Sequence, residues 1–186
     1  PPRSTLFPYT TLFRSISLMS ARVLAIIALG SNVGDSQAIL ARVIERLAAL
    51  STLPLLQSSF WQTTPVDCPP GSPPFVNAVI GLAPQREETP ESLLEKLLLL
   101  EKEFGRKTRK VVNEPRRLDL DLIAFGEETR VSKQLILPHP RAHTRRFVLQ
   151  PLSEIAPNLI LPGQRLSVAS LLAALKTDEK LVRLNP

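Results

Sequence analysis

The sequence has little cysteine, little glycine and few aromatic residues. Its 186 residues include one Cys, Cys68, together with seven Gly, one Trp and one Tyr. A single Cys excludes an internal disulfide framework and is compatible with a reducing compartment. No apolar run approaches the ~20 residues that a helix needs to cross a bilayer. These absences predict a cytoplasmic protein that has no membrane partner.

Several well-known site motifs are also missing. The chain has no Gly-x-x-x-x-Gly-Lys-Ser/Thr loop and no set of protein-kinase motifs. It has neither the Cys/His spacing of a zinc site nor a nucleophile elbow. Phosphates that bind to this chain must therefore bind without a standard nucleotide loop.

The composition is that of a folded, basic domain. Hydrophobic residues make up 44% of the chain and charged residues 22%, and the net charge is +6. That hydrophobic fraction is too high for a disordered chain, and the length suits one globular domain. We expect residues 19–186 to form a single domain.

The first 18 residues differ from the rest of the chain. They contain two of the seven Phe and the only Tyr, without helical or strand periodicity. Residues 5–15 resemble the conceptual translation of a common DNA-sequencing adapter. We therefore interpret residues 1–18 as a non-native, disordered leader and Met19 as the natural start. The apolar run at residues 23–29 is too short for a signal peptide and lacks an Ala-x-Ala cleavage pattern.

Hydrophobic periodicity predicts alternating strands and helices. We expect strands at residues 23–29, 55–63, 75–82 and 118–125, helices at 36–50 and 89–104, and shorter helical pieces near 145–149 and 168–175. Asp35 or Ser36 can cap the first helix, and Pro90 marks the start of the second. The order β-α-β-β-α-β with a C-terminal extension predicts an α+β fold, a ferredoxin-like sheet with helices packed on one face.

Two aspartates lie one residue apart in the last predicted strand. Asp119 and Asp121 would project from one face of the strand, while Leu120 points into the core. Adjacent carboxylates repel each other unless a cation lies between them, and hard oxygen ligands favour Mg²⁺. Two solvated carboxylates on an edge strand are the alternative interpretation.

A basic segment precedes this pair. Six cations lie within twelve positions, opposed only by Glu114: Arg106, Lys107, Arg109, Lys110, Arg116 and Arg117. They would surround metal-bound phosphates with positive charge, and Arg binds phosphate oxygens bidentately. A solvated loop and a nucleic-acid patch remain open as alternatives.

Two further groups suit a phosphate and a flat ring. His139, His143 and three arginines, Arg141, Arg145 and Arg146, lie close to prolines and could hold phosphate. Phe75 and Asn77 share a strand face, where a ring and a carboxamide could stack on and hydrogen-bond a heterocycle. The alternatives are an exposed or structural His, a core Phe75 and a turn residue at Asn77.

These residues together resemble the 6-hydroxymethyl-7,8-dihydropterin pyrophosphokinases of folate biosynthesis. The likeness covers nearly all of residues 19–186 and rests on eight blocks in order: Ala28-Leu29-Gly30-Ser31-Asn32; Ser58-Ser59-Phe60 with Thr63 and Pro65; Phe75-Val76-Asn77-Ala78; Glu101 with Gly105-Arg106; Pro115 to Ile123; Leu137-Pro138-His139; Arg145-Arg146-Phe147; and Pro151-Leu152 with Glu154 to Pro157. The family has a ferredoxin-like fold. It transfers the β,γ-pyrophosphoryl group of ATP to the pterin hydroxymethyl oxygen and releases AMP.

The resemblance implies a role for each matching residue. Asp119 and Asp121 would bind two Mg²⁺ ions. The pterin would contact Thr63, Val66, Phe75, Asn77 and Phe147; ATP would contact Glu101, Arg116, Leu122, His139 and Arg145; and Arg106 and Arg116 would be the catalytic arginines. The implied ligands are ATP, dihydropterin and Mg²⁺, with no nucleic acid, and the chain is expected to be a monomer.

The sequence departs from the family in the basic segment. Val112, Asn113 and Glu114 stand where the family commonly has Arg-Trp-Gly, and Leu98 and Pro140 also replace the usual residues. A lost cation and a gained acid near phosphates could slow catalysis. The alternatives to a working enzyme are therefore a pterin-binding homologue with little or no turnover and a basic nucleic-acid-binding domain.

Overall fold

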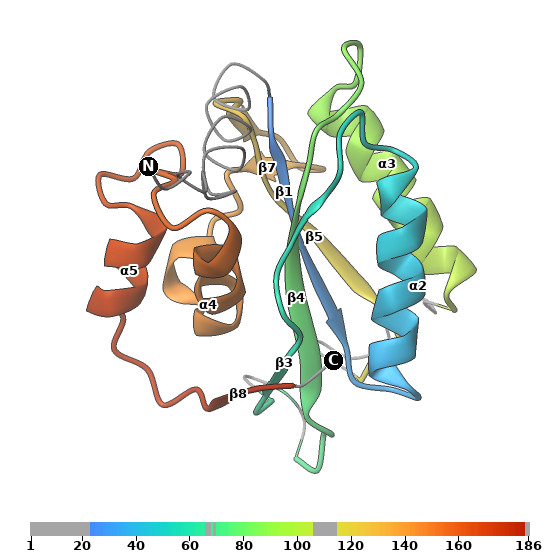
Figure 1. Ribbon diagram of the computed structural model, residues 1–186, viewed down its shortest axis with the longest axis vertical. Helices are drawn as coiled ribbons and strands as arrows, with labels where there is room; N and C mark the ends of the chain where they lie inside the picture. The colour runs from blue at the N-terminus through green and yellow to red at the C-terminus, as the bar shows by residue number, and fades with distance from the viewer. Residues whose placement is uncertain (1–22, 66–67, 69, 106–114, 185–186) are drawn as a thin grey trace, which may run out of the picture.

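The computed structural model in Figure 1 describes residues 23–65, 68, 70–105 and 115–184. The leader at residues 1–18 lies outside this range, so its interpretation stays a prediction. Val66, Arg106 and residues 112–114 also lie outside the described residues.

The core of the fold is a six-stranded sheet. Its strands are β1 (Ala25–Ser31), β2 (Leu56–Gln57), β3 (Trp61–Thr63), β4 (Phe75–Leu82), β5 (Asp119–Phe125) and β8 (Leu181–Arg183). The order across the sheet is β5-β1-β4-β3-β8, with β2 also paired to β4 and every pair antiparallel. Apart from the added β8, this is the order of the ferredoxin-like arrangement, which confirms the predicted fold class.

Four α-helices cover the two faces of this sheet. They are α2 (Ser36–Ala48), α3 (Pro90–Glu103), α4 (Arg146–Ile155) and α5 (Val168–Ala174). Figure 1 shows α2 and α3 on one side of the sheet and α4 and α5 on the other. The Asp35 side chain caps α2, and Thr89 forms a capping box with Ser92 at the start of α3. None of the helices in the described part of the chain is long and apolar enough to cross a membrane.

The C-terminal extension departs from the sequence-based expectation. It adds a second helical layer, whereas helices were expected on one face only. The helix α4 continues through Pro151 to Ile155, past the end of the helical piece expected near residues 145–149. The buried residues Val148, Leu149 and Leu152 pack this helix against the sheet, and that packing offsets the backbone hydrogen bond that proline cannot donate.

Five short strands differ from the prediction. Residues 55–63 form two strands because the pairing with β4 shifts by one residue between Gln57, opposite Ile80, and Trp61, opposite Asn77. Strands β6 (Arg130–Val131) and β7 (Ile136–Leu137) form a separate hairpin, and a 3₁₀ turn at Ala142–Thr144 precedes α4. Strand β8 brings the end of the described chain to the outer edge of β3.

Candidate active site

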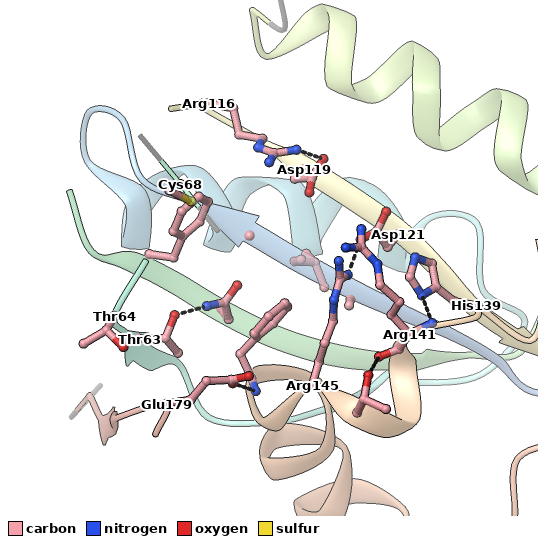
Figure 2. A pocket seen from close by; sticks show the side chains of 17 residues that line it. Thr63, Thr64, Cys68, Arg116, Asp119, Asp121, His139, Arg141, Arg145 and Glu179 are labelled. Carbon is pink, nitrogen blue, oxygen red and sulfur yellow. Dashed lines mark hydrogen bonds and ion pairs between the residues drawn. The ribbon is translucent and has the colours of Figure 1, made fainter. Parts of the chain in front are cut away.

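A pocket of about 400 Å³ lies on the α4 side of the sheet (Figure 2). Its walls come from β1, β3 and the loop after it, β4, β5 and the residue Arg116 before it, the segment before α4 and the start of that helix, and Glu179. The lining residues are Ala28, Leu29, Gly30, Thr63, Thr64, Cys68, Phe75, Asn77, Arg116, Asp119, Asp121, His139, Arg141, Thr144, Arg145, Phe147 and Glu179. One site thus gathers residues from six separate stretches of the sequence.

Small residues in β1 make the space for this pocket. Ala28 lies opposite Asp121 on one side, and Gly30 lies opposite Asp119 on one side and Asn77 on the other. A Cβ on Gly30 would come within 3.1 Å of the Asn77 Oδ1 and 3.9 Å of the Asp119 Cβ. The strand register places these two polar side chains on either side of Gly30, and the space between them stays open because Gly30 has no side chain.

The strand β5 presents its two carboxylates to the pocket, as the sequence predicts. Leu120 points the opposite way and is 4% exposed in the core beneath α2 and α3. Arg116 Nη1 donates to Asp119 Oδ1 at 2.9 Å, and Arg145 Nη1 lies 3.9 Å from Asp121 Oδ2. Figure 2 shows both arginines directed at the carboxylates.

Burial and the neighbouring charges shift the pKa values of two residues at this end of the pocket, Asp121 and His139. Burial raises the pKa of Asp121, and the neighbouring Asp119 charge raises it further against the opposing effects of His139, Arg145 and Arg116. Burial lowers the pKa of His139; Arg145 and Arg141 act in the same direction, and Asp121 opposes them. A cation bound here would offset the cost of ionising the partly buried Asp121 beside Asp119, and the imidazole favours its neutral form.

The donor set fits Mg²⁺ bound together with a phosphate. Within the described residues, no group of three or more His, Cys, Asp or Glu side chains could hold a metal by itself. Mg²⁺ commonly binds one or two protein carboxylates and completes its shell with water and substrate phosphate. Asp119 and Asp121 supply that number of carboxylates.

The other end of the pocket is aromatic and amide-lined. Phe75 and Phe147 line it, and the buried Asn77 donates through Nδ2 to the Thr63 hydroxyl at 2.7 Å. The Arg145 guanidinium lies 5.3 Å from the centroid of the Phe147 ring. Arg145 therefore stands at the boundary between the aromatic and the charged ends.

Backbone anchors hold the charged residues in place. The His139 N–H donates to the Ile123 carbonyl at 2.8 Å, which ties the segment before α4 to β5. Asn32 holds Arg116: its N–H donates to the Arg116 carbonyl at 3.0 Å, and its Oδ1 accepts from the Arg116 N–H at 2.8 Å. Asn32 was part of a family block in the sequence, but only the fold shows this contact.

The structure does not bring every expected site residue to the pocket. Glu101 is fully buried on α3, where its Oε1 accepts from the Leu120 N–H at 2.8 Å. Leu122 is buried in the core on the α2 and α3 face. Val66 and Arg106 lie outside the described residues.

Sequence reasoning missed several residues that line the pocket. Thr64, Cys68 and Glu179 were not singled out as site residues. Thr64 and Cys68 lie in the Pro-rich loop after β3, and proximity to Thr63 was a usable signal for Thr64. No local pattern indicated Glu179, because its position depends on the pairing of β8.

Curated proteins resemble this chain over most of its length. A 2-amino-4-hydroxy-6-hydroxymethyldihydropteridine pyrophosphokinase of Haemophilus influenzae is 36% identical over 165 residues, which is 88% of this chain and 99% of that protein. The enzyme of the same name from Methylorubrum extorquens is 37% identical over 140 residues, 75% of this chain and 87% of that one.

Solved structures share the fold at low sequence identity. A structure described as HPPK-DHPS in complex with substrates superposes with a TM-score of 0.63 at 13% identity, over 82% of this chain. The wild-type HPPK-DHPS of Plasmodium falciparum with SDX-DHP gives 0.65 at 12% identity, over 81% of this chain. The present chain spans 43% and 44% of those two chains, so the likeness concerns one part of each.

A family model covers most of the described sheet and the start of the extension. The model for 7,8-dihydro-6-hydroxymethylpterin-pyrophosphokinase matches residues 26–157, which include both carboxylates and all but the last of the pocket's lining residues. Together with the full-length relatives, this match shows that the chain belongs to the 7,8-dihydro-6-hydroxymethylpterin-pyrophosphokinase (HPPK) family.

Proposed function

We propose that the pocket carries out the reaction of its family. The chain is a 2-amino-4-hydroxy-6-hydroxymethyldihydropteridine diphosphokinase, which transfers pyrophosphate from ATP to 6-hydroxymethyl-7,8-dihydropterin in folate biosynthesis and releases AMP. One observation supports the assignment of this reaction to the pocket: an aromatic, amide-lined end adjoins an end with two carboxylates and several cations. A flat heterocycle and a triphosphate need these two environments side by side.

The aromatic end would bind the pterin. Phe75 and Phe147 would stack on the two faces of the ring, and Asn77 would hydrogen-bond its amide edge. Thr63 supports this role because its hydroxyl accepts from Asn77 and so orients the carboxamide. The proposed contribution of Val66 falls outside the described residues.

The charged end would bind the triphosphate. Asp119 and Asp121 would hold two Mg²⁺ ions, which neutralise and orient phosphate oxygens when they are bound. Arg116, Arg145 and His139 would contact the phosphates, since each arginine can exchange its carboxylate partner for phosphate oxygens.

Two residues outside the pocket would support the nucleotide side indirectly. Glu101 accepts from the N–H of Leu120, the residue between the two aspartates, and would therefore set the position of both. Leu122 would support the nucleotide side from the core beneath β5. The proposed catalytic role of Arg106 rests on the family resemblance.

The reaction needs positioning and charge neutralisation more than covalent chemistry. The pterin hydroxymethyl oxygen forms a bond to the β-phosphorus, and the bond from that phosphorus to the AMP oxygen breaks. No side chain has to become a covalent nucleophile. The fixed cations Arg116 and Arg145 would stabilise the charge that develops on the transferred group.

We also propose that the chain works as a cytoplasmic monomer without a nucleic-acid or membrane ligand. ATP as co-substrate supports the cytoplasm. The mass from light scattering tests whether the chain is a monomer. The amount of Mg²⁺ bound together with a non-cleavable ATP analogue tests whether the pocket holds two ions.

The decisive experiment measures AMP release by residues 19–186 with MgATP and 6-hydroxymethyl-7,8-dihydropterin. We expect AMP only when the pterin is present. The double variant Asp119→Ala/Asp121→Ala should remain folded and release none. No AMP from the folded, unchanged chain would contradict the proposed activity and favour a pterin-binding homologue without turnover.

A further inference from the structure

The last described segment of the chain crosses the open edge of the sheet beside the pocket. Strand β8 pairs with β3 so that Leu181 lies opposite Thr63. The Thr64 N–H donates to the Lys180 carbonyl at 3.3 Å, and the Leu184 N–H donates to the Phe60 carbonyl at 2.8 Å. This pairing brings Glu179 to the wall of the pocket.

The start of α4 has no side-chain cap of its own. Arg145 occupies the N-cap position, and its side chain makes no capping hydrogen bond. Glu179 supplies the missing acceptor from a distant part of the chain: its Oε2 accepts from the Phe147 N–H at 3.1 Å. Figure 2 shows this carboxylate beside Arg145 at the edge of the pocket. A carboxylate satisfies the free N–H groups of a helix start and also favours its positive end.

We propose that Glu179 is a positioning residue of the pterin site, acting by capping α4 from the C-terminal segment and thereby fixing Phe147. The inference rests on the proposed function, in which Phe147 stacks on the pterin. Phe147 is the second residue of α4, and the Arg145 guanidinium lies over its ring. A displacement of the helix start would therefore move the stacking ring and the neighbouring cation together.

The Glu179 carboxylate interacts with several groups at the start of α4. Burial raises its pKa, while the backbone N–H groups of Phe147 and Arg146 and the charges of Arg145 and Arg146 oppose that effect. The adjacent Asp178 has the same charge on the same segment but is exposed and lines no part of the pocket. Asp178 is therefore a matched control for Glu179.

Pterin binding tests the proposal directly. The dissociation constant of 6-hydroxymethylpterin is measured by its fluorescence in the presence of Mg²⁺ and α,β-methylene-ATP. We expect Glu179→Ala to weaken binding about tenfold, as when one charge-assisted hydrogen bond is lost. Glu179→Gln, which keeps an acceptor oxygen, should recover most of the affinity. Asp178→Ala should bind within about twofold of the unchanged chain, since exposed substitutions have small effects.

A double variant separates positioning from a general loss of stability. If Glu179 acts through Phe147, Phe147→Ala/Glu179→Ala should bind pterin no more weakly than Phe147→Ala alone. A full additional loss in the double variant would overturn the proposal. Equal affinities for Glu179→Ala and Asp178→Ala would also overturn it.

Amide hydrogen exchange tests the cap independently of the substrate. Glu179→Ala should speed exchange at the Phe147 amide, whereas Asp178→Ala should not. If the unchanged chain binds no pterin although this exchange responds as expected, the proposed function fails and the cap stands. If exchange does not respond, the capping role of Glu179 fails whatever the chain binds.

Discussion

The two faces of the sheet are built from alternate residues of the same strands, yet they have different contents. Toward α2 and α3, β5 presents Leu120 and Leu122 to a continuous apolar core. Toward α4, the same strand presents Asp119 and Asp121 to a polar pocket. The strand period of two thus separates a face that stabilises the fold from a face that can bind charged ligands. Changes on the two faces should therefore have different consequences.

The largest effect is expected for Asp121→Asn. The change keeps the shape of the side chain but removes a charge that would hold Mg²⁺ near the phosphates. We expect the turnover number to fall about 10²–10³-fold, the scale seen when one preorganised electrostatic contact is lost. Steady-state AMP release across a Mg²⁺ titration measures it. Turnover within a few-fold of the unchanged chain would contradict the metal role.

Leu40→Ala tests the opposite face. Leu40 lies on α2, is fully buried and belongs to the core under that helix. The truncation should lower the free energy of unfolding by about 2–5 kcal/mol. Pterin and ATP KM values at low temperature should stay unchanged, because the pocket is on the other side of the sheet.

Urea denaturation measures the loss, with Val131→Ala as the control. Val131 is 93% exposed, so its truncation should change the free energy of unfolding by less than about 0.5 kcal/mol. Equal losses of unfolding free energy in Leu40→Ala and Val131→Ala would contradict the assignment of Leu40 to the core and Val131 to the surface.

Asn77→Ala should affect substrate binding more than stability. The change removes the carboxamide that the Thr63 hydroxyl orients toward the pocket. We expect the KM for pterin to rise about 10–100-fold, as for a lost hydrogen bond in a buried site. The KM for ATP should change little. Initial rates with each substrate varied in turn provide the comparison, and equal rises in both values would argue against a pterin-specific role.

Gly30→Ala tests the space between the two ends of the pocket. The new Cβ would lie 3.1 Å from the Asn77 Oδ1, so Asn77 must shift by a few tenths of an ångström. We expect a rise in the pterin KM of about 3–10-fold, smaller than the effect of removing Asn77 altogether. Asn77→Ala/Gly30→Ala should then be close to Asn77→Ala alone. An unchanged KM in the single variant would show that Asn77 tolerates the contact.

The smallest effect on stability is expected for the exposed ion pair between Glu91 of α3 and Arg130. The exposed Glu91 accepts from Arg130 Nε at 2.6 Å, and this hydrogen bond lowers the pKa of Glu91 below its ordinary value of 4.5. A lowered pKa in the folded state means that the pair stabilises the fold above about pH 4.5 and that this contribution is lost as the pH falls through the lowered value.

Glu91→Gln should therefore lower the Tm by no more than about 2 °C at pH 7, where the pair is exposed and screened by solvent. The difference from the unchanged chain should vanish below the lowered pKa and shrink in 1 M salt. Thermal melts over pH 3–7 check this. A difference that grows as the pH falls would contradict the ion pair.

The central elements of the fold could be predicted from the sequence. The third strand was expected at residues 75–82 and occurs at Phe75–Leu82, and the helices α2 and α3 begin at the expected caps. Their apolar periods are local, so neighbouring residues carry enough information. The common face of Asp119 and Asp121 was predictable for the same reason, because it depends only on the geometry of one strand.

The rest depended on contacts between distant parts of the chain. Residues 55–63 form two strands because their register with β4 shifts. The second helical layer forms because it covers a second apolar face of the sheet, which includes Ile26 and Val79. Glu179 reaches the pocket only because β8 pairs with β3.

The sequence by itself therefore determined the central strands β1, β4 and β5, the main helices α2 and α3, and the chemistry of the two carboxylates. Only the tertiary structure decided that Gly30 leaves room between Asp119 and Asn77, and that Glu179 caps the helix carrying Phe147. The physical reason is the range of the interactions. Periodicity and capping act within a few residues, whereas sheet register and a cap from a distant segment exist only after the chain has folded.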